Sequence, residues 1–213
     1  PHIIVLNKCD LADIKANNEW CKHFESQQIT TLLTDSKTGY GINGFKGKIK
    51  TALSEKIAEF EKKGMVGKKL RIMVVGIPNV GKSSLINKLC GAKRAKVEDR
   101  PGVTLNKQWV KIDNDVELLD MPGVLWRKFD NNNIASNLAF IGSIKDEILD
   151  IETLAMSLID ELKNIYPQLL MERYKLTESD LEMDTYDILR KIARKRGMLL
   201  PGNEENTERA AIM

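Results

Sequence analysis

Long apolar runs, paired cysteines and a secretory signal are all lacking in this chain of 213 residues. No apolar run approaches the roughly 18 to 20 residues that a membrane-spanning helix needs. No basic region followed by an apolar stretch and a cleavage site opens the chain, so we expect no secretory signal. The three cysteines (Cys9, Cys21 and Cys90) form no C-x-x-C pair, so neither a disulfide framework nor a zinc site is indicated. These absences predict a reduced, cytoplasmic protein.

A strong excess of charge of one sign is also missing. Lys and Arg number 33 against 30 Asp and Glu, and the formal net charge of +3 is too small by itself to indicate nucleic-acid binding. The chain does have 42% hydrophobic and 30% charged residues, a balance that excludes a disordered tail or a collagen-like repeat. Its length suits one domain of ordinary size plus a small one.

The first part of the chain, residues 1–130, alternates strand and helix signals. Short β-branched apolar runs predict strands, and the stretches between them predict helices. The expected strands cover residues 3–6, 29–33, 71–75 and two segments within 109–120, and the expected helices cover 13–26, 43–62 and 83–89. Because alternating strands and helices bury both faces of a sheet, we predict an α/β fold with a mostly parallel sheet.

The remaining residues, 131–213, carry no strand signal and predict a separate small all-α domain. Apolar residues recur at helical spacing between Ile144 and Leu162. Further helices are expected over 169–175 and 184–196. The closing residues resemble an interrupted helix, so we expect this domain to be incomplete at its C-terminal end.

The strongest chemical signal is GIPNVGKS over residues 76–83, which matches G-x-x-x-x-G-K-[ST] between an expected strand and an expected helix. The glycines let backbone N–H groups turn toward phosphates at the positive end of a helix. Lys82 would reach the β- and γ-phosphates, and the hydroxyl of Ser83 would bind Mg²⁺. A plain glycine turn would have no use for these two side chains. The predicted phosphate-binding residues here are Asn79, Val80, Gly81, Lys82, Ser83 and Ser84.

A second signal, Asp120-Met121-Pro122-Gly123, directly follows an apolar strand. A carboxylate at the end of a strand beside the P-loop can hold Mg²⁺, which indicates Asp120. The small Gly123 would let its N–H approach the γ-phosphate. The pattern alone is weak, because an Asp-initiated turn would explain it, but its position after the P-loop favours a functional role.

Guanine recognition is predicted from N-K-x-D at the end of the first strand. Guanine presents N1–H and a 2-amino group together, and a single carboxylate, Asp10, can accept both. Adenine lacks this donor pair, so a buried Asp10 would reject it. By themselves the four residues could equally be a helix N-cap after a strand. The predicted guanine-binding residues are Asn7, Lys8, Cys9 and Asp10, with Asp35 and Ser36 from a second loop in which Ser36 holds Asp10.

These motifs stand in an unusual order, since N-K-x-D and the base loop precede the P-loop, whereas in ordinary small GTPases they follow it. The order resembles that of circularly permuted GTPases. Nearly the whole chain resembles the ribosome biogenesis GTPase A family, on the motifs above, on Arg100-Pro101-Gly102-Val103-Thr104 and on residues 137–150. The resemblance implies a permuted P-loop G domain over 1–130 and a helical domain that binds ribosomal RNA over 131–213.

Three residue roles follow from the resemblance. Thr104 matches the switch threonine whose hydroxyl completes the Mg²⁺ shell when GTP is bound, although a β-branched strand opener is the alternative. Asn79 resembles the P-loop asparagine that helps related GTPases hold K⁺, against a plain turn asparagine. Val124 stands where Ras-like enzymes have a water-orienting glutamine, so we expect slow hydrolysis unless a partner helps. The predicted catalytic residues are Lys82, Thr104 and Gly123, with no water-orienting residue identified.

The resemblance also implies a segment that this chain lacks. The family carries a strand and a histidine before N-K-x-D, whereas only six residues precede it here, and neither His2 nor His23 matches that histidine. The missing strand would lie between strands 3–6 and 71–75, so its absence would leave two buried edges unpaired. We therefore expect an N-terminally incomplete copy, or another segment in the gap. Direct pairing of the two strands would contradict this.

The last cluster places five cations in seven residues near a helix end: Arg190, Lys191, Arg194, Lys195 and Arg196. It could be a solvated helix end that complements the helix dipole. It could also contact the phosphate backbone of RNA, in a salt-sensitive and sequence-tolerant way. The family resemblance favours RNA contact.

The sequence thus predicts a monomeric switch that hydrolyses GTP with Mg²⁺, and with K⁺ if Asn79 binds it. It would bind the large-ribosomal-subunit precursor and its rRNA in the GTP state and leave after hydrolysis, with no membrane or DNA partner. The alternatives are a nucleotide-responsive scaffold with negligible hydrolysis and another RNA-associated permuted GTPase. A third, an ATP-using enzyme, is disfavoured by Asp10.

Overall fold

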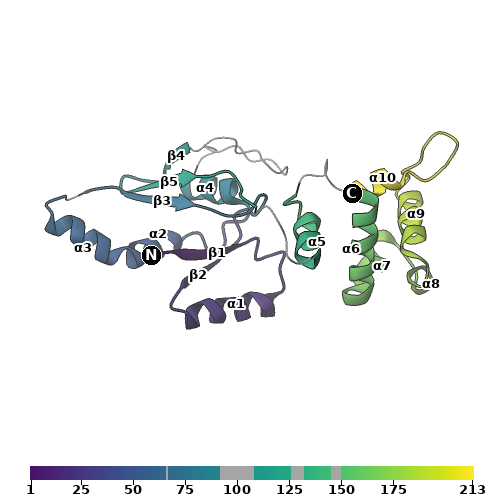
Figure 1. Ribbon diagram of the computed structural model, residues 1–213, viewed down its shortest axis with the longest axis horizontal. Coiled ribbons are helices and arrows are strands. Elements are labelled where there is room, and N and C mark those ends of the chain that lie inside the picture. The colour runs from purple at the N-terminus through teal and green to yellow at the C-terminus, as the bar shows by residue number, and fades with distance from the viewer. Residues whose placement is uncertain (66, 92–107, 126–131, 145–149) are drawn as a thin grey trace. The chain divides into compact units, whose positions relative to one another are not determined.

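The computed structural model describes residues 1–65, 67–91, 108–125, 132–144 and 150–213 (Figure 1). They divide into two compact units, Pro1–Arg127 and Lys128–Met213. Among the described residues, the named strands all lie in the first unit, and the second unit is built from helices.

The strands of the first unit form two sheets. In one, β1 (Ile3–Asn7) pairs in parallel with β2 (Thr30–Thr34), so that the last residues of the two strands lie opposite each other. In the other, β5 (Val116–Asp120) lies between β3 (Leu70–Val74), to which it is parallel, and β4 (Gln108–Lys111), to which it is antiparallel. The mostly parallel pairing and the helices between strands agree with the predicted α/β class.

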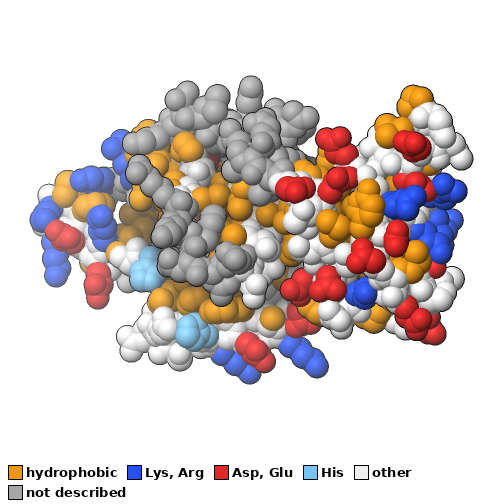
Figure 2. Space-filling model, turned by 45° about the vertical axis from the view of Figure 1, so that its right-hand side comes forward, with side chains coloured by type: hydrophobic (Ala, Val, Ile, Leu, Met, Phe, Trp, Pro, Cys, Tyr) orange, Lys and Arg blue, Asp and Glu red, His pale blue; other side chains and the backbone are white. Residues whose placement is uncertain are grey.

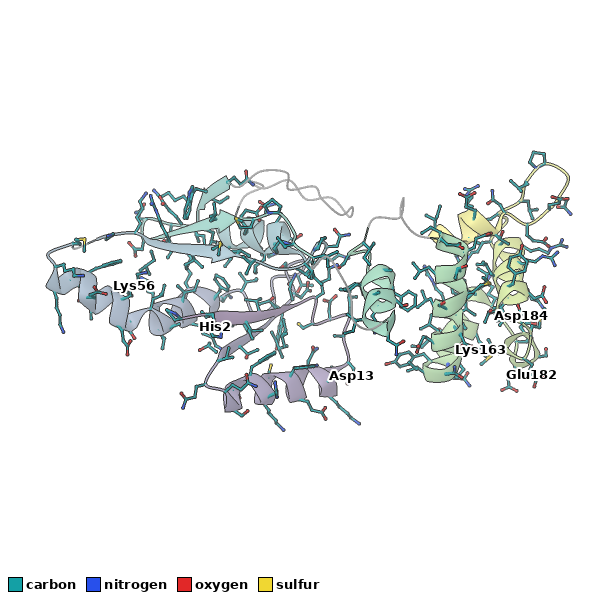
Figure 3. The ribbon with its side chains drawn as sticks, viewed as in Figure 1. His2, Asp13, Lys56, Lys163, Glu182 and Asp184 are labelled. Carbon is teal, nitrogen blue, oxygen red and sulfur yellow. The ribbon has the colours of Figure 1, made fainter. Side chains whose placement is uncertain are left out.

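Within the described ranges, four helices connect these strands. They are α1 (Ile14–Ser26), α2 (Phe45–Ala52), α3 (Ser54–Lys62) and α4 (Lys82–Cys90). The start of α1 is fixed by Asp13, labelled in Figure 3, whose Oδ1 accepts the N–H of Ala16 over 2.9 Å. A cap of this kind contributes about 1 kcal/mol to helix stability.

The prediction of a single helix over 43–62 is wrong in one respect. The structure has two helices there, α2 and α3, which are separated at Leu53. Just before the break, Thr51 Oγ1 donates to the carbonyl of Gly47 over 3.1 Å. A threonine that bonds back to the preceding turn bends a helix, and glycine is a weak helix former. Hydrophobic periodicity does not reveal such a local contact.

The core of the first unit lies between the β3-β5-β4 sheet and α4. Val116 and Leu118 alternate along β5 and are fully buried, as is Ile86 of α4. Burial of each such side chain contributes about 1.5–3 kcal/mol of transfer free energy. The core continues through Leu32, Phe45 and Ile49 of β2 and α2. This packing holds the N-terminus of α4 at the end of β3.

The edges of β1 and β3 that face each other are separated by a cavity. The cavity has a volume of about 680 Å³ and is lined by residues of both strands, among them Val5 and Ile72. His2, at the start of β1 in Figure 3, also lines it. Within the described ranges β1 pairs only with β2, and β3 only with β5. The pairing that would contradict the predicted gap is therefore not seen, and the gap stays a prediction.

The second unit contains six helices in its described part. They are α5 (Asn132–Phe140), α6 (Ile151–Ile165), α7 (Pro167–Tyr174), α8 (Glu178–Leu181), α9 (Thr185–Lys195) and α10 (Thr207–Ile212). Their core includes Ile159, Leu170, Ile188, Leu189 and Ile192. None of the described helices is long and apolar enough to cross a membrane.

Two helix predictions in this unit need correction. The pattern that begins at Ile144 predicts an early start for the long helix, but α6 begins only at Ile151. There Asp150 Oδ1 accepts the N–H of Thr153 over 3.2 Å, so a cap overrides the periodicity. Helix α5 has no counterpart among the predicted helices. Residues 145–149 lie outside the described residues.

Candidate nucleotide-binding site

The P-loop joins β3 to α4 and adopts two left-handed backbone conformations. Asn79 has φ +59° and Gly81 has φ +89°. A Cβ on Gly81 would overlap Nδ2 of Asn7, so this position needs glycine for its space as well as for its φ. Such turns, at the N-terminus of a helix, give a backbone that favours anions.

Lys82 extends back over the same loop. Its Nζ donates to the carbonyls of Gly76 over 3.0 Å and Ile77 over 2.7 Å. Burial lowers the pKa of Lys82, and the nearby Asp120 carboxylate opposes that change. The predicted phosphate-binding cation is thus held at the centre of the loop, between neutral acceptors.

Ser83 and Asp120 come together beside this loop. Ser83 Oγ donates to Asp120 Oδ2 over 3.2 Å, which joins the start of α4 to the end of β5. Asp120 is fully buried, and its Oδ1 has no hydrogen-bond partner in the described part of the chain. A buried carboxylate oxygen without a partner is unfavourable unless a cation compensates it. A hydroxyl and a carboxylate are oxygen ligands, so this pair fits the predicted Mg²⁺.

The segment after Asp120 lies directly on the P-loop. A Cβ on Gly123 would come within 2.7 Å of the backbone of Pro78, so only glycine fits at this approach. The N–H of Val124 donates to the carbonyl of Gly76 over 3.2 Å. The side chain of Val124 is exposed and apolar, so it has no group that could orient water.

Asn7 connects the N-K-x-D motif to two other segments. Its Nδ2 donates to the carbonyl of Val80 over 2.8 Å. Its Oδ1 accepts from Ser36 Oγ over 2.7 Å, from Ser36 N over 3.2 Å and from Thr34 Oγ1 over 3.1 Å. The end of β1, the end of β2 with its loop, and the P-loop therefore meet at one side chain.

Lys8, Cys9 and Asp10 follow at the turn that leaves β1. Lys8 has φ +57°, a left-handed conformation that residues other than glycine adopt infrequently. Cys9 donates its N–H to the carbonyl of Thr34 over 3.2 Å, and burial raises the pKa of its thiol. Asp10 is exposed and forms no ion pair with a described residue, so the burial expected for it would have to come from the base itself.

The base loop differs from the prediction in two contacts. Ser36 donates to Asn7 and not to Asp10, because Asn7 lies opposite the end of β2. The carboxylate of Asp35 accepts from Thr38 Oγ1 and from the N–H groups of Lys37 and Thr38. The Thr38 hydroxyl is the main cause of a lowered pKa of Asp35. Asp35 thus shapes the loop, and its carboxylate is already engaged.

Comparison with known proteins now decides the family. A family model described as 50S ribosome-binding GTPase matches residues 71–196. Ribosome biogenesis GTPase A of Bacillus pumilus is 41% identical over 209 residues, which cover 98% of this chain and 73% of that protein. The chain belongs to the ribosome biogenesis GTPase A family. The sequence-based prediction of a P-loop GTPase of this family is confirmed.

Solved structures support the same fold for this ribosome biogenesis GTPase A homologue. GDP-bound YlqF matches with a TM-score of 0.60 and 27% identity, over 99% of this chain and 74% of that one. GNP-bound YlqF from T. maritima gives a TM-score of 0.59, also at 27% identity, over 98% of this chain and 72% of that one.

Two further groups of predicted site residues in this family member remain to be accounted for. Thr104, with the rest of residues 100–104, lies outside the described residues. The five predicted RNA-contacting cations lie on or directly after α9, and each has an intramolecular partner. Sequence reasoning missed Thr34, which supports Asn7, and the close approach of Pro78 to Gly123. The register of β1 against β2 could have indicated Thr34, whereas the P-loop motif that contains Pro78 does not indicate this approach.

Proposed function

We propose that the chain binds GTP, hydrolyses it to GDP and phosphate, and acts in assembly of the large ribosomal subunit through contact with precursor rRNA. The names of its relatives and of its family model support the ribosomal part. We further propose that it acts as a cytoplasmic monomer, with neither a membrane nor a DNA partner.

The observation that carries the proposal is the junction at Asn7. One side chain bonds both the P-loop and the base loop, so a nucleotide could be held at its phosphates and its base by a single connected frame. Asp10 follows Asn7 by three residues and has an exposed carboxylate. That carboxylate can accept the two adjacent donors of guanine, which adenine lacks.

The phosphate end has a division of roles. Lys82 would neutralise charge on the β- and γ-phosphates, and the N–H of Gly123 would donate to the γ-phosphate. Ser83 and Asp120, with Thr104, would hold Mg²⁺, which neutralises developing charge on the phosphates when bound. The described residues contain no group of three or more His, Cys, Asp or Glu that could hold a metal alone, so the nucleotide itself would have to complete the site.

Slow intrinsic hydrolysis follows from Val124. Its side chain cannot orient the attacking water, so a partner or a monovalent cation must supply what is missing. Asn79 is the residue that would hold K⁺ there, where a cation stabilises transition-state charge. A scaffold that binds GTP but hydrolyses it negligibly is the alternative that Val124 also favours.

GTP turnover with and without purified large ribosomal subunits tests the proposal, with each condition measured in KCl and in NaCl. We expect subunits to raise the rate, and K⁺ to raise it above Na⁺. A rate that neither addition changes would leave the assembly-GTPase mechanism without support and favour the scaffold.

Competition of GDP against ADP tests base selection, with Asp10→Asn as the control variant. Equal affinity of the wild type for the two nucleotides would remove the role of Asp10.

A further inference from the structure

The cations predicted for RNA contact lie on two sides of the buried stripe of α9. That stripe consists of Ile188, Leu189, Ile192 and Ala193. Residues four apart lie one above the other on a helix, so Arg190 and Arg194 flank the stripe on one side and Lys191 and Lys195 on the other. Figure 2 shows Lys and Arg side chains gathered on one side of the helical unit. Their partners differ in charge: carboxylates pair with Arg190, Arg194 and Lys191, whereas backbone carbonyls accept from Lys195 and Arg196.

The arginine side is neutralised by carboxylates. Glu205 accepts from Arg190 Nη2 over 3.2 Å and from Arg194 Nη2 over 2.6 Å. Asp187 Oδ1 also lies 3.5 Å from Arg190 Nη1. The side chain of Glu205 is only 12% exposed, so it lies beneath the two guanidinium groups. Two cations face two anions here, and the group fastens the segment around Glu205 to α9.

The C-terminal end of α9 is different, because neutral groups accept the hydrogen bonds of its last two cations, Lys195 and Arg196. Lys195 Nζ donates to the carbonyl of Lys175, and Arg196 Nη2 donates to the carbonyl of Arg173 over 2.8 Å. The Arg196 guanidinium also lies 5.4 Å from the centre of the Tyr174 ring. A carbonyl or an aromatic ring orients a cation without cancelling its charge.

The end of α7 adds two cations to this group. The carbonyls that hold Lys195 and Arg196 belong to Lys175 and Arg173, whose own side chains are exposed and have no ion pair in the described part of the chain. We call these four residues the α7–α9 corner. The ion pair that reaches this corner, among those of the described residues, comes from the buried Asp180, which pairs with Lys191 and lies 3.7 Å from Lys195 Nζ.

We propose that the α7–α9 corner is the surface that contacts RNA phosphates, and that Arg190 and Arg194 are structural. This rests on the proposed function, since it assigns the rRNA contact to particular residues. Charge that is not cancelled locally attracts the phosphate backbone. The α7 carbonyls already orient the side chains of Lys195 and Arg196, so binding of RNA phosphates to these two residues costs less side-chain conformational entropy. Arg173 and Lys175 are not among the residues predicted for RNA contact, because they precede the basic cluster in sequence.

Two double variants with the same loss of charge test this in the full chain. The corner variant is Arg173→Gln with Lys175→Gln, which breaks no described side-chain contact. The staple variant is Arg190→Gln with Arg194→Gln. Affinity for a labelled large-subunit rRNA transcript is measured from low to physiological salt, together with the thermal midpoint and GDP affinity of each protein.

We expect the corner variant to reduce the slope of log affinity against log salt by about 2, roughly 1 for each phosphate that the protein no longer neutralises, with an unchanged thermal midpoint. We expect the staple variant to keep the wild-type slope and to have a lower midpoint. A corner variant with the wild-type slope, or a staple variant whose slope falls as much as that of the corner variant, would overturn the assignment. A wild type without salt-dependent rRNA affinity would contradict the proposed function itself.

Discussion

Asn7 donates to the carbonyl of Val80 over 2.8 Å, across 73 positions of sequence, and so ties the end of β1 to the P-loop. Together with its contacts to Thr34 and Ser36, this makes Asn7 a support for both halves of the site. The two halves need such a link because β1 and β3 do not pair with each other in the described residues.

Asn7→Ala should therefore lower nucleotide affinity and stability together. The substitution leaves the Val80 carbonyl and the Ser36 hydroxyl without their partner, which costs on the order of 2–4 kcal/mol for a partly buried group of this size. Asn17→Ala is the matched control, since among the described residues the Asn17 side chain makes a single hydrogen bond, to the carbonyl of Cys9. GDP titration and thermal unfolding measure both effects. Equal losses in the two variants would show that Asn7 has no special role.

Gly81→Ala should abolish nucleotide binding, whereas Gly91→Ala should cost only about 1 kcal/mol of stability. Both glycines have positive φ, +89° and +64°. They differ in space, because a Cβ at position 81 would overlap Asn7 Nδ2, whereas a Cβ at position 91 meets no atom of the described residues within 4 Å. GDP affinity of the two variants separates steric overlap from backbone strain. If Gly91→Ala also lost GDP binding, strain alone would explain both.

Much of this site could be predicted from sequence, because phosphate and base chemistry fix residue types at fixed spacing. Lys82, Ser83 and Asp120 lie together as their motifs require. The partner of Ser36 could not be predicted, since it depends on the register that places Asn7 beside the end of β2. The break at Leu53 likewise depends on a local side-chain bond rather than on hydrophobic pattern.

Asp120→Asn should make the nucleotide-free protein more stable while removing its response to Mg²⁺. The buried Oδ1 of Asp120 has no hydrogen-bond partner among the described residues, so a neutral amide removes a buried charge whose desolvation Lys82 and the Ser83 hydroxyl offset only in part. Thermal unfolding is measured without ligand, with GDP, and with GDP and Mg²⁺. Ser83→Ala serves as control, since it removes the hydroxyl ligand but keeps the carboxylate. A less stable nucleotide-free Asp120→Asn protein would contradict the expectation.

Acid should weaken the helical unit through Asp180. Its hydrogen bonds with Lys191 and with Thr177 hold the pKa of Asp180 well below its usual range. Because the pKa is depressed in the folded state, the stabilisation is present above the unfolded value of about 3.9 and is lost as pH falls below it. Lowering the pH from about 5 to about 3 crosses this unfolded value. Over that range the thermal midpoint of Asp180→Asn should thus fall less than the midpoint of the wild type.

The control for this titration is Asp160→Asn, which alters an exposed aspartate of α6 with no ion pair in the described part of the chain. It should keep the wild-type dependence on pH. If Asp180→Asn kept that dependence as well, the Lys191 contact would not be a source of acid sensitivity.

Hydrogen exchange should reveal the edges of β1 and β3 that face the cavity between them. A strand paired on one side protects only about every other amide, because the remaining N–H groups point away from its partner. β5 is the internal control, since it is paired on both sides by β3 and β4. We expect fast exchange at alternate amides of β1 and β3 and slow exchange along β5. Uniform protection of β1 and β3 would mean that the gap between them is already filled, and the predicted vacancy would be wrong.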